Sequence, residues 1–141
     1  MTQFLPPDTR LVFDTNVLVS AFVYKKFAGE VYQHCAERYY LFTSAWILEE
    51  LADKLTHKFK LPEPVQNDIL AQVRADTRLV LPTNALPTDS SDPDDNYVLQ
   101  VALFVDANVL ITGDKEHLLP LRRIANTEII SPREFYERYI A

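Results

Sequence analysis

Acidic side chains follow short apolar segments at four separate places in the chain. They are Asp14, Glu50, the group Asp92, Asp94 and Asp95, and Asp114. Carboxylate oxygens are the ligands that suit Mg²⁺ or Mn²⁺ rather than Zn²⁺. Two unit charges about 4 Å apart repel by ~4 kcal/mol at an effective dielectric constant near 20, so gathered carboxylates need a counter-charge. If the fold brings these acids together, the sequence predicts a site for a divalent metal ion.

The elements that must position these acids alternate along the chain. Short apolar runs predict five strands, at Leu11–Phe13, Tyr40–Thr43, Arg78–Leu81, Val109–Thr112 and Glu128–Ile130. Between them, helical spacing of apolar residues and helix-capping residues predict seven helices, at 16–24, 27–37 with a break near Gly29, 44–59, 62–73, 93–106, 115–119 and from 132 onward. Alternation of this kind favours a parallel sheet with right-handed crossovers. Residues just beyond the carboxyl ends of parallel strands converge on one crevice, which is where we expect the acids to meet.

Each acid also has a purely structural explanation. Asp14, Asp92 and Asp114 stand where helix N-caps are expected, and acids in a first helical turn suit the helix dipole. Paired glutamates on a helix usually face solvent, and periodicity favours Glu50 over Glu49 only weakly, so that choice stays open. No single acid is decisive. A metal site is favoured because acids recur near the carboxyl ends of several predicted strands.

Size and composition describe an ordinary globular protein. The 141 residues suit one domain over 1–141, with 48% hydrophobic and 24% charged residues. We expect no membrane segment, because no stretch approaches ~20 apolar residues. Cys35 is the single cysteine, which excludes an internal disulfide, and the amino-terminal residues lack signal-peptide features. A cytoplasmic protein is the simplest interpretation.

The net charge of −6 is unusual for a protein that binds nucleic acid. If four acids occupy one metal pocket, however, the remaining surface is closer to neutral. Basic residues that could border the crevice and hold phosphates are Lys25, Lys26, Lys54, Lys58, Lys60, Arg122 and Arg123. The same residues can equally be ordinary solvated charge, so this assignment stays open.

Several other kinds of site lack their sequence signatures. Only two glycines are present, so no glycine-rich phosphate loop can form. His34, His57 and His117 have no zinc-ligand spacing, and no serine stands in a nucleophile elbow. A phosphatase of the haloacid dehalogenase type would need a second aspartate where Asn16 stands. A receiver domain would need an acidic pair near the first strand.

Four segments together resemble the acidic motifs of PIN-domain ribonucleases. They are Val12–Ser20, Ser44–Leu51, Asp92–Leu99 and Leu110–Lys115, in the order and at the spacing usual for that family. The chain is most similar to the bacterial branch of VapC-like toxins from type II toxin–antitoxin pairs. The resemblance implies an α/β fold, a three-layer α/β/α sandwich around a central five-stranded parallel sheet.

The resemblance also implies a set of site residues and a reaction. The catalytic and metal-binding acids would be Asp14, Glu50, Asp95 and Asp114, with Asp92 as a fifth metal ligand and Asn16 and Thr112 as supporting polar residues. With one or two Mg²⁺ or Mn²⁺ ions bound, a water would attack the phosphodiester in line. The products would carry a 5′-phosphate and a 3′-hydroxyl.

The partners implied by the resemblance are an RNA substrate and a small antitoxin protein. Homodimers are common in the family, and Phe135, Tyr136 and Tyr139 could contribute to one, although their helical spacing fits core packing better. The alternative to a nuclease is a PIN-fold protein-interaction module with little or no nuclease activity. The sequence specifies neither the RNA target nor the cleavage sequence.

Overall fold

The computed structural model describes residues 2–141, in which six strands form one sheet in the order β3-β2-β1-β4-β6-β5. The strands are β1 Arg10–Phe13, β2 Tyr40–Ser44, β3 Thr77–Val80, β4 Val109–Ile111, β5 Arg123–Ile124 and β6 Thr127–Ile130. The first five in spatial order are parallel, as predicted, and β5 pairs antiparallel with β6. The sequence did not predict β5, because two residues are too short to form an apolar run.

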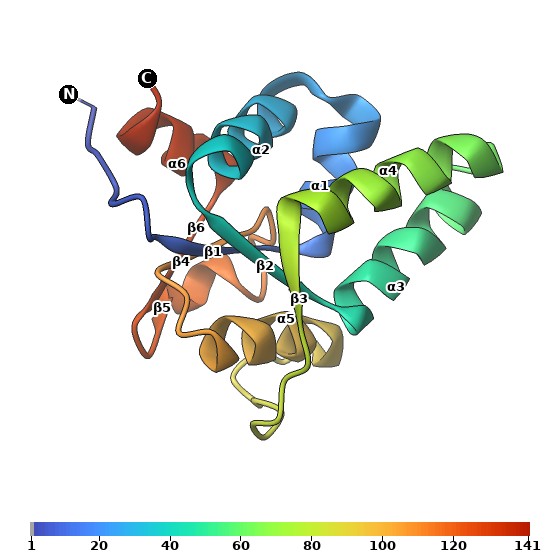
Figure 1. Cartoon of the computed structure of the whole chain (residues 1–141). Helices are drawn as coiled ribbons and strands as arrows, with labels where there is room; N and C mark the ends of the chain where they lie inside the picture. Colours follow the sequence, from blue (N-terminus) through green and yellow to red (C-terminus); the bar gives the residue numbers. More distant parts are fainter. Residues whose placement is uncertain (1) are drawn as a thin grey trace.

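Helices cover both faces of the sheet (Figure 1). They are α1 Thr15–Val19, α2 Lys26–Arg38, α3 Ala45–Asp53, α4 Glu63–Asp76, α5 Pro93–Phe104 and α6 Pro132–Tyr139. Two π-helical turns, η1 Ser20–Tyr24 and η2 Lys54–Lys58, continue α1 and α3, and η3 Leu119–Leu121 is a 3₁₀ turn. Helix α5 packs against β1 and β2 on one face, while α2, α4 and α6 lie over the other. This is the three-layer arrangement that the resemblance implied.

The central strands β1 and β4 form the middle of the core. Leu11 and Val12 of β1 and Leu110 and Ile111 of β4 have no exposed surface. Strands covered by helices on both faces must be apolar at every position. The two strands are therefore continuous apolar runs in the sequence, and these runs predicted them correctly. The edge strand β3 is partly open instead, and Leu79 remains more than half exposed.

Four predicted helices differ from the observed ones, the first being 16–24, which changes to a π-helical turn at Ser20. Helix α2 runs unbroken through Gly29, where a Cβ atom would lie 3.1 Å from the Ala21 carbonyl oxygen. The glycine therefore permits close packing against η1 and does not interrupt the helix. The predicted 44–59 helix changes to a π-helical turn at Lys54. The predicted 115–119 helix is wrong: this segment forms turns, and a 3₁₀ turn begins at Leu119.

The aromatic residues of α6 belong to the core. Phe135 is wholly buried, Tyr139 is nearly so, and the Tyr136 ring lies 4.8 Å from the Phe27 ring. Phe135 and Tyr139 therefore pack in the core, and Tyr136 is half-buried against it. Within residues 2–141, no helix is both long and apolar enough to cross a membrane.

Candidate active site

The sheet order places Asp14 next to the segment that carries Asp114. Asp14 directly follows β1, which pairs with β4 so that Phe13 lies beside Ile111. The Asp14 N–H donates a 2.9 Å hydrogen bond to the Ile111 carbonyl oxygen and continues this pairing by one residue. Two acids that are 100 positions apart in the chain thus emerge from the same edge of the sheet.

Thr112 links these two acids. Its hydroxyl donates a 2.8 Å hydrogen bond to Asp14 Oδ2 and accepts a 3.0 Å bond from the Asp114 N–H. Thr112 has no exposed surface, and the hydroxyl is therefore held in one orientation. This is the position that the resemblance marked as supporting, and its geometry suits that role.

Asp95 enters the same region from the first turn of α5. The Ser90 hydroxyl donates a 3.2 Å hydrogen bond to Asp95 Oδ2 and accepts a 3.1 Å bond from the Asp92 N–H. The Asn96 side chain clamps Ser90 in place through two 3.0 Å bonds to the Ser90 backbone. Ser90 was not among the predicted site residues, because its only signal is its position in a turn-rich loop just before the acidic group.

Asp92 serves as the N-cap of α5. Its Oδ1 accepts a 3.0 Å hydrogen bond from the Asp94 N–H, with Pro93 at the first helical position. The structural explanation offered by the sequence is therefore real for this residue. Asp92 also borders the cavity beside Asp114, so both proposed roles remain compatible.

Asp95 and Asp114 are joined by a hydrogen bond between their carboxyl groups, and their pKa values shift in opposite directions. Burial, this hydrogen bond and the charge of Asp114 raise the pKa of Asp95 to about 8. Burial pushes the pKa of Asp114 upward as well. The bond from Asp95 and the backbone N–H groups of His117 and Glu116 outweigh that effect and hold it below its ordinary value. Asp95 is therefore the more readily protonated of the two acids.

Asp14 is the most enclosed of the four acids, with 4% of its surface exposed. Burial raises the pKa of Asp14, and the Asp114 charge adds to that rise, while the Thr112 hydroxyl opposes it. A buried carboxylate with an acidic neighbour is stabilised by any positive charge that enters the crevice.

Glu50, rather than Glu49, faces this group. Burial raises the pKa of Glu50, as do the charges of Asp94 and Asp14, and Lys54 and the Thr15 hydroxyl oppose the shift. Glu49 is exposed and borders a separate hollow beside α4. The structure thus brings Glu50 to the other predicted acids and leaves Glu49 outside.

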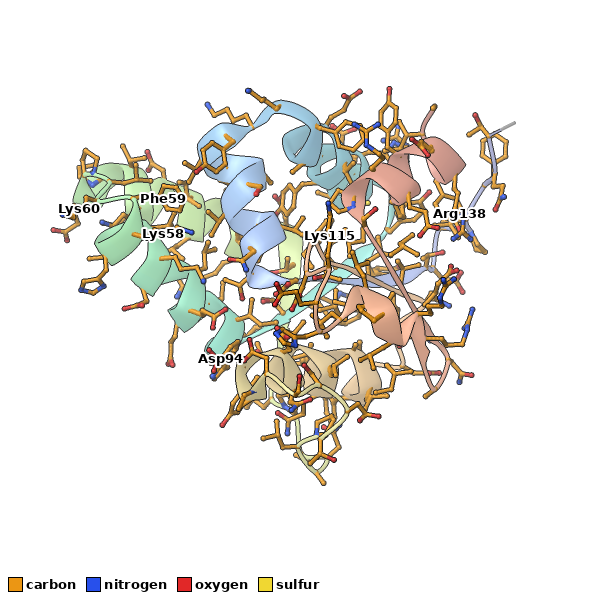
Figure 2. All side chains as sticks on the ribbon, turned by 180° about the vertical axis from the view of Figure 1, so that it is seen from behind. Lys58, Phe59, Lys60, Asp94, Lys115 and Arg138 are labelled. Carbon is orange, nitrogen blue, oxygen red and sulfur yellow. The ribbon has the colours of Figure 1, made fainter. Side chains whose placement is uncertain are left out.

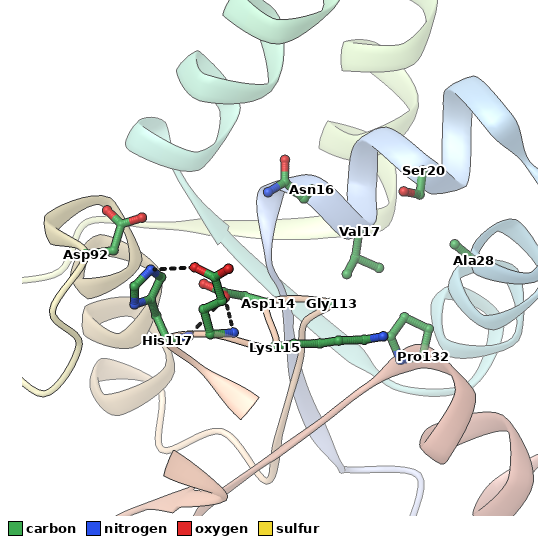
Figure 3. A pocket seen from close by; sticks show the side chains of 11 residues that line it. Asn16, Val17, Ser20, Ala28, Asp92, Gly113, Asp114, Lys115, His117 and Pro132 are labelled. Atoms are coloured by element: carbon green, nitrogen blue, oxygen red, sulfur yellow. Dashed lines mark hydrogen bonds and ion pairs between the residues drawn. The ribbon is translucent and has the colours of Figure 1, made fainter. Parts of the chain in front are cut away.

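A cavity of about 690 Å³ opens beside Asp114, which is the one of these four acids among its lining residues (Figure 3). Asn16, which is exposed, and Asp92 both line it, together with Asp114 and His117, and the Lys115 side chain extends toward Pro132. His117 Nδ1 lies 3.0 Å from the Ser91 hydroxyl. His117 was not among the predicted site residues, because a lone histidine is usually a surface or boundary residue.

The chemistry of this cluster fits a hard divalent cation. Every predicted ligand is a carboxylate, and burial raises the pKa values of Asp14, Glu50 and Asp95, with the charges of neighbouring carboxylates adding to the rise. Within residues 2–141, however, no three acidic, histidine or cysteine side chains stand close enough together to hold a metal ion. A bound cation would therefore have to draw the carboxylates inward from their present positions.

Comparisons with known proteins identify the family. Residues 10–116 match the PIN domain, a range that includes all four predicted acids, whereas no curated protein matches the chain. The fold is similar to VapBC2 from Rickettsia felis bound to a DNA fragment from its promoter, with 13% identity and a TM-score of 0.62 over 87% of this chain and 98% of that one. PIN domains are generally nucleases. The chain belongs to the PIN domain family.

Proposed function

We propose that this chain is a Mg²⁺- or Mn²⁺-dependent endoribonuclease with Asp14, Glu50, Asp95 and Asp114 as its catalytic acids. One observation carries the proposal: the acids come from four separate segments and influence one another's pKa values at the carboxyl edge of the sheet. Capping alone does not explain this convergence, because Asp95 and Glu50 cap no helix.

In the proposed reaction, a bound divalent ion supplies positive charge to the scissile phosphate and lowers the pKa of a water molecule. Asp14, Glu50 and Asp114 would hold the ion, and Thr112 keeps Asp14 in place by its 2.8 Å hydrogen bond. Asp95, anchored by Ser90, orients the water for in-line attack. The products carry a 5′-phosphate and a 3′-hydroxyl.

The cavity beside Asp114 is the proposed place of the scissile nucleotide. Lys115 and His117 border it, and both can contact phosphate oxygens that the carboxylates would otherwise repel. Asn16 borders the same cavity and can donate a hydrogen bond to the nucleotide from the opposite side. These contacts give the substrate an orientation without requiring a base-specific pocket.

We further propose that the enzyme is the toxin of a toxin–antitoxin pair that acts in the cytoplasm. The fold similarity to VapBC2 supports this assignment, as does the resemblance of the acidic motifs to VapC toxins. A small antitoxin would close the crevice by placing a basic side chain against the acids. Induced expression of the wild-type chain in a bacterial host should stop growth, and expression of Asp14→Asn should not.

The direct test is cleavage of a mixed RNA panel by purified protein with Mn²⁺ or Mg²⁺. EDTA and the Asp114→Asn variant are the controls, and activity should disappear in both. Cleavage that persists in both controls would reject this site. Absence of both cleavage and metal binding would instead support a PIN-fold module that binds proteins.

A further inference from the structure

Lysine side chains gather at one end of the molecule, next to the acidic crevice. Five of the six lysines lie on or beside the two π-helical turns: Lys25, Lys26, Lys54, Lys58 and Lys60. Within residues 2–141, no lysine nitrogen has a carboxylate oxygen within 4.0 Å. By contrast, Arg10, Arg38, Arg133 and Arg138 each form an ion pair. The lysine charges are therefore available to a partner.

A row of side chains leads from the site toward this end. Lys54 lies one turn beyond Glu50, close enough to lower the pKa of both Glu50 and Asp14. Lys58 follows after four more residues, so the row from Glu50 extends ~12 Å along the helix axis, which is longer than one nucleotide. The Phe59 N–H donates a 3.1 Å hydrogen bond to the Lys54 carbonyl oxygen. This π-type bond places Phe59 one turn above Lys54.

Aromatic rings accompany the lysines. The Tyr24 and Phe59 rings meet edge to face with centroids 5.7 Å apart, and Lys58 Nζ lies 5.5 Å from the Phe59 centroid. Tyr24 is 59% exposed even though it is a large aromatic residue. Figure 2 shows Lys58, Phe59 and Lys60 together at this end of the molecule. Phe59 is half-buried beside the Tyr24 ring. Aromatic rings that remain accessible among unpaired cations are the usual components of a surface that binds single-stranded nucleic acid.

We propose that Tyr24, Lys54, Lys58, Phe59 and Lys60, here called the lysine–aromatic ledge, bind the single-stranded RNA that extends from the cleaved phosphodiester. The proposal rests on the proposed ribonuclease function and adds a substrate-binding surface to it. Lys54, Lys58 and Lys60 contact successive phosphates, while Tyr24 and Phe59 stack against bases. The ledge suits RNA better than an antitoxin that carries a basic segment, because such a segment would be repelled by the unpaired lysines.

The test measures equilibrium binding of a labelled single-stranded oligouridine in EDTA, with Asp14→Asn in every protein to prevent cleavage. Tyr24→Ala with Phe59→Ala should weaken binding ~10-fold, as expected for lost base stacking. Tyr24→Phe with Phe59→Tyr keeps both rings and should restore affinity. Lys58→Gln with Lys60→Gln should reduce the slope of log affinity against log salt by about 1.4, since each phosphate contact on a single strand contributes ~0.7.

The matched charge control is Arg122→Gln with Arg123→Gln. These two exposed arginines lie around β5, and Arg122 borders a different cavity, beside α6. This variant loses the same two charges but should leave the affinity and the salt slope unchanged. All variants are compared by circular dichroism and thermal midpoint, so that a misfolded protein is recognised and replaced by the ring-exchange or single-lysine variant.

Unchanged oligouridine binding in both folded ledge variants would overturn the proposal, even if the wild type cleaves RNA. An equal loss in the arginine control would overturn it too, because binding would then follow net charge alone. If binding in the Asp14→Asn background depends on the ledge but the wild-type protein cleaves no RNA, the ledge is supported and the ribonuclease function is rejected. The two proposals can therefore fail separately.

Discussion

At the scale of single residues, Thr112 shows how one hydroxyl organises the acids. It donates to Asp14 Oδ2 and accepts from the Asp114 N–H, so it holds two proposed ligands from neighbouring strands in one arrangement. Residues that orient metal ligands typically contribute 10- to 100-fold to metal affinity or activity. A substitution of Thr112 therefore changes the orientation of Asp14 without removing any of the carboxylates proposed to bind the metal ion.

We expect Thr112→Val to lower the rate of RNA cleavage ~10- to 100-fold, because Asp14 loses its orienting hydrogen bond. Thr112→Ser keeps the hydroxyl and should retain most of the activity. The measurement is the Mn²⁺ dependence of cleavage, in which Thr112→Val should need more metal. Equal rates in the valine and serine variants would show that the hydrogen bond has no functional role.

Asp14→Asn should abolish cleavage while raising the free energy of unfolding. The pKa of Asp14 is raised by burial, which means that its ionised form is unfavourable in the folded protein. Asparagine keeps an oxygen that can accept the Thr112 hydrogen bond and removes the charge. Urea unfolding and the cleavage assay together check this prediction, and an active Asp14→Asn protein would contradict the assignment of this residue.

At the scale of elements, the start of helix α5 gives different roles to Asp92, its N-cap, and Asp95, in its first turn. Asp92 caps the helix through the Asp94 N–H, while Asp95 turns inward to Ser90 and Asp114. Asparagine caps a helix as well as aspartate does, but it is a weaker ligand for a divalent ion. Replacing Asp92 by asparagine therefore tests whether capping helix α5 is the only role of this residue.

Asp92→Asn should leave the thermal midpoint nearly unchanged, whereas Asp92→Ala should destabilise the protein by ~1 kcal/mol through loss of the cap. If Asp92 is also a fifth metal ligand, Asp92→Asn should raise the Mg²⁺ concentration needed for half-maximal cleavage. An unchanged Mg²⁺ dependence would restrict Asp92 to its structural role at the start of α5.

At the scale of the whole molecule, the acidic cluster should make stability depend on pH. An acid whose pKa is higher in the folded state binds more protons there than in the unfolded chain. The free energy of unfolding then falls as pH rises between the two pKa values. For Asp95 this window extends from 3.8 to about 8, and the raised pKa values of Asp14 and Glu50 act in the same direction. The lowered pKa of Asp114 acts oppositely and below this range.

We therefore expect the free energy of unfolding in EDTA to decrease from pH 5 to pH 8, by at most about 1.4 kcal/mol per pH unit for each additional proton bound. Asp95→Asn should make this dependence shallower, and Mg²⁺ should restore stability at pH 8 because it binds only the folded carboxylates. Urea unfolding at several pH values provides the measurement. Equal slopes for wild type and Asp95→Asn would show that Asp95 holds no proton in this range.

The sequence by itself determined the five parallel strands and showed that the acids lie at the carboxyl edge of the sheet. Buried strands must be apolar throughout, and residues that follow them necessarily reach one edge of the sheet, so local pattern was sufficient. Resemblance to PIN-domain motifs selected the four acids among several candidates. The short β5 and the turns over 115–119 escaped prediction because brief elements leave no periodic signal.

Only the tertiary structure decided which side chains touch. The link through Thr112, the hydrogen bond between Asp95 and Asp114, and the preference for Glu50 over Glu49 depend on contacts between segments far apart in the chain. Likewise, the sequence grouped the lysines with Arg122 and Arg123, but two π-helical turns bring Tyr24 to Phe59 and leave the arginines elsewhere. Periodicity records which face of a helix is apolar, whereas the position of that helix is set by packing against its neighbours.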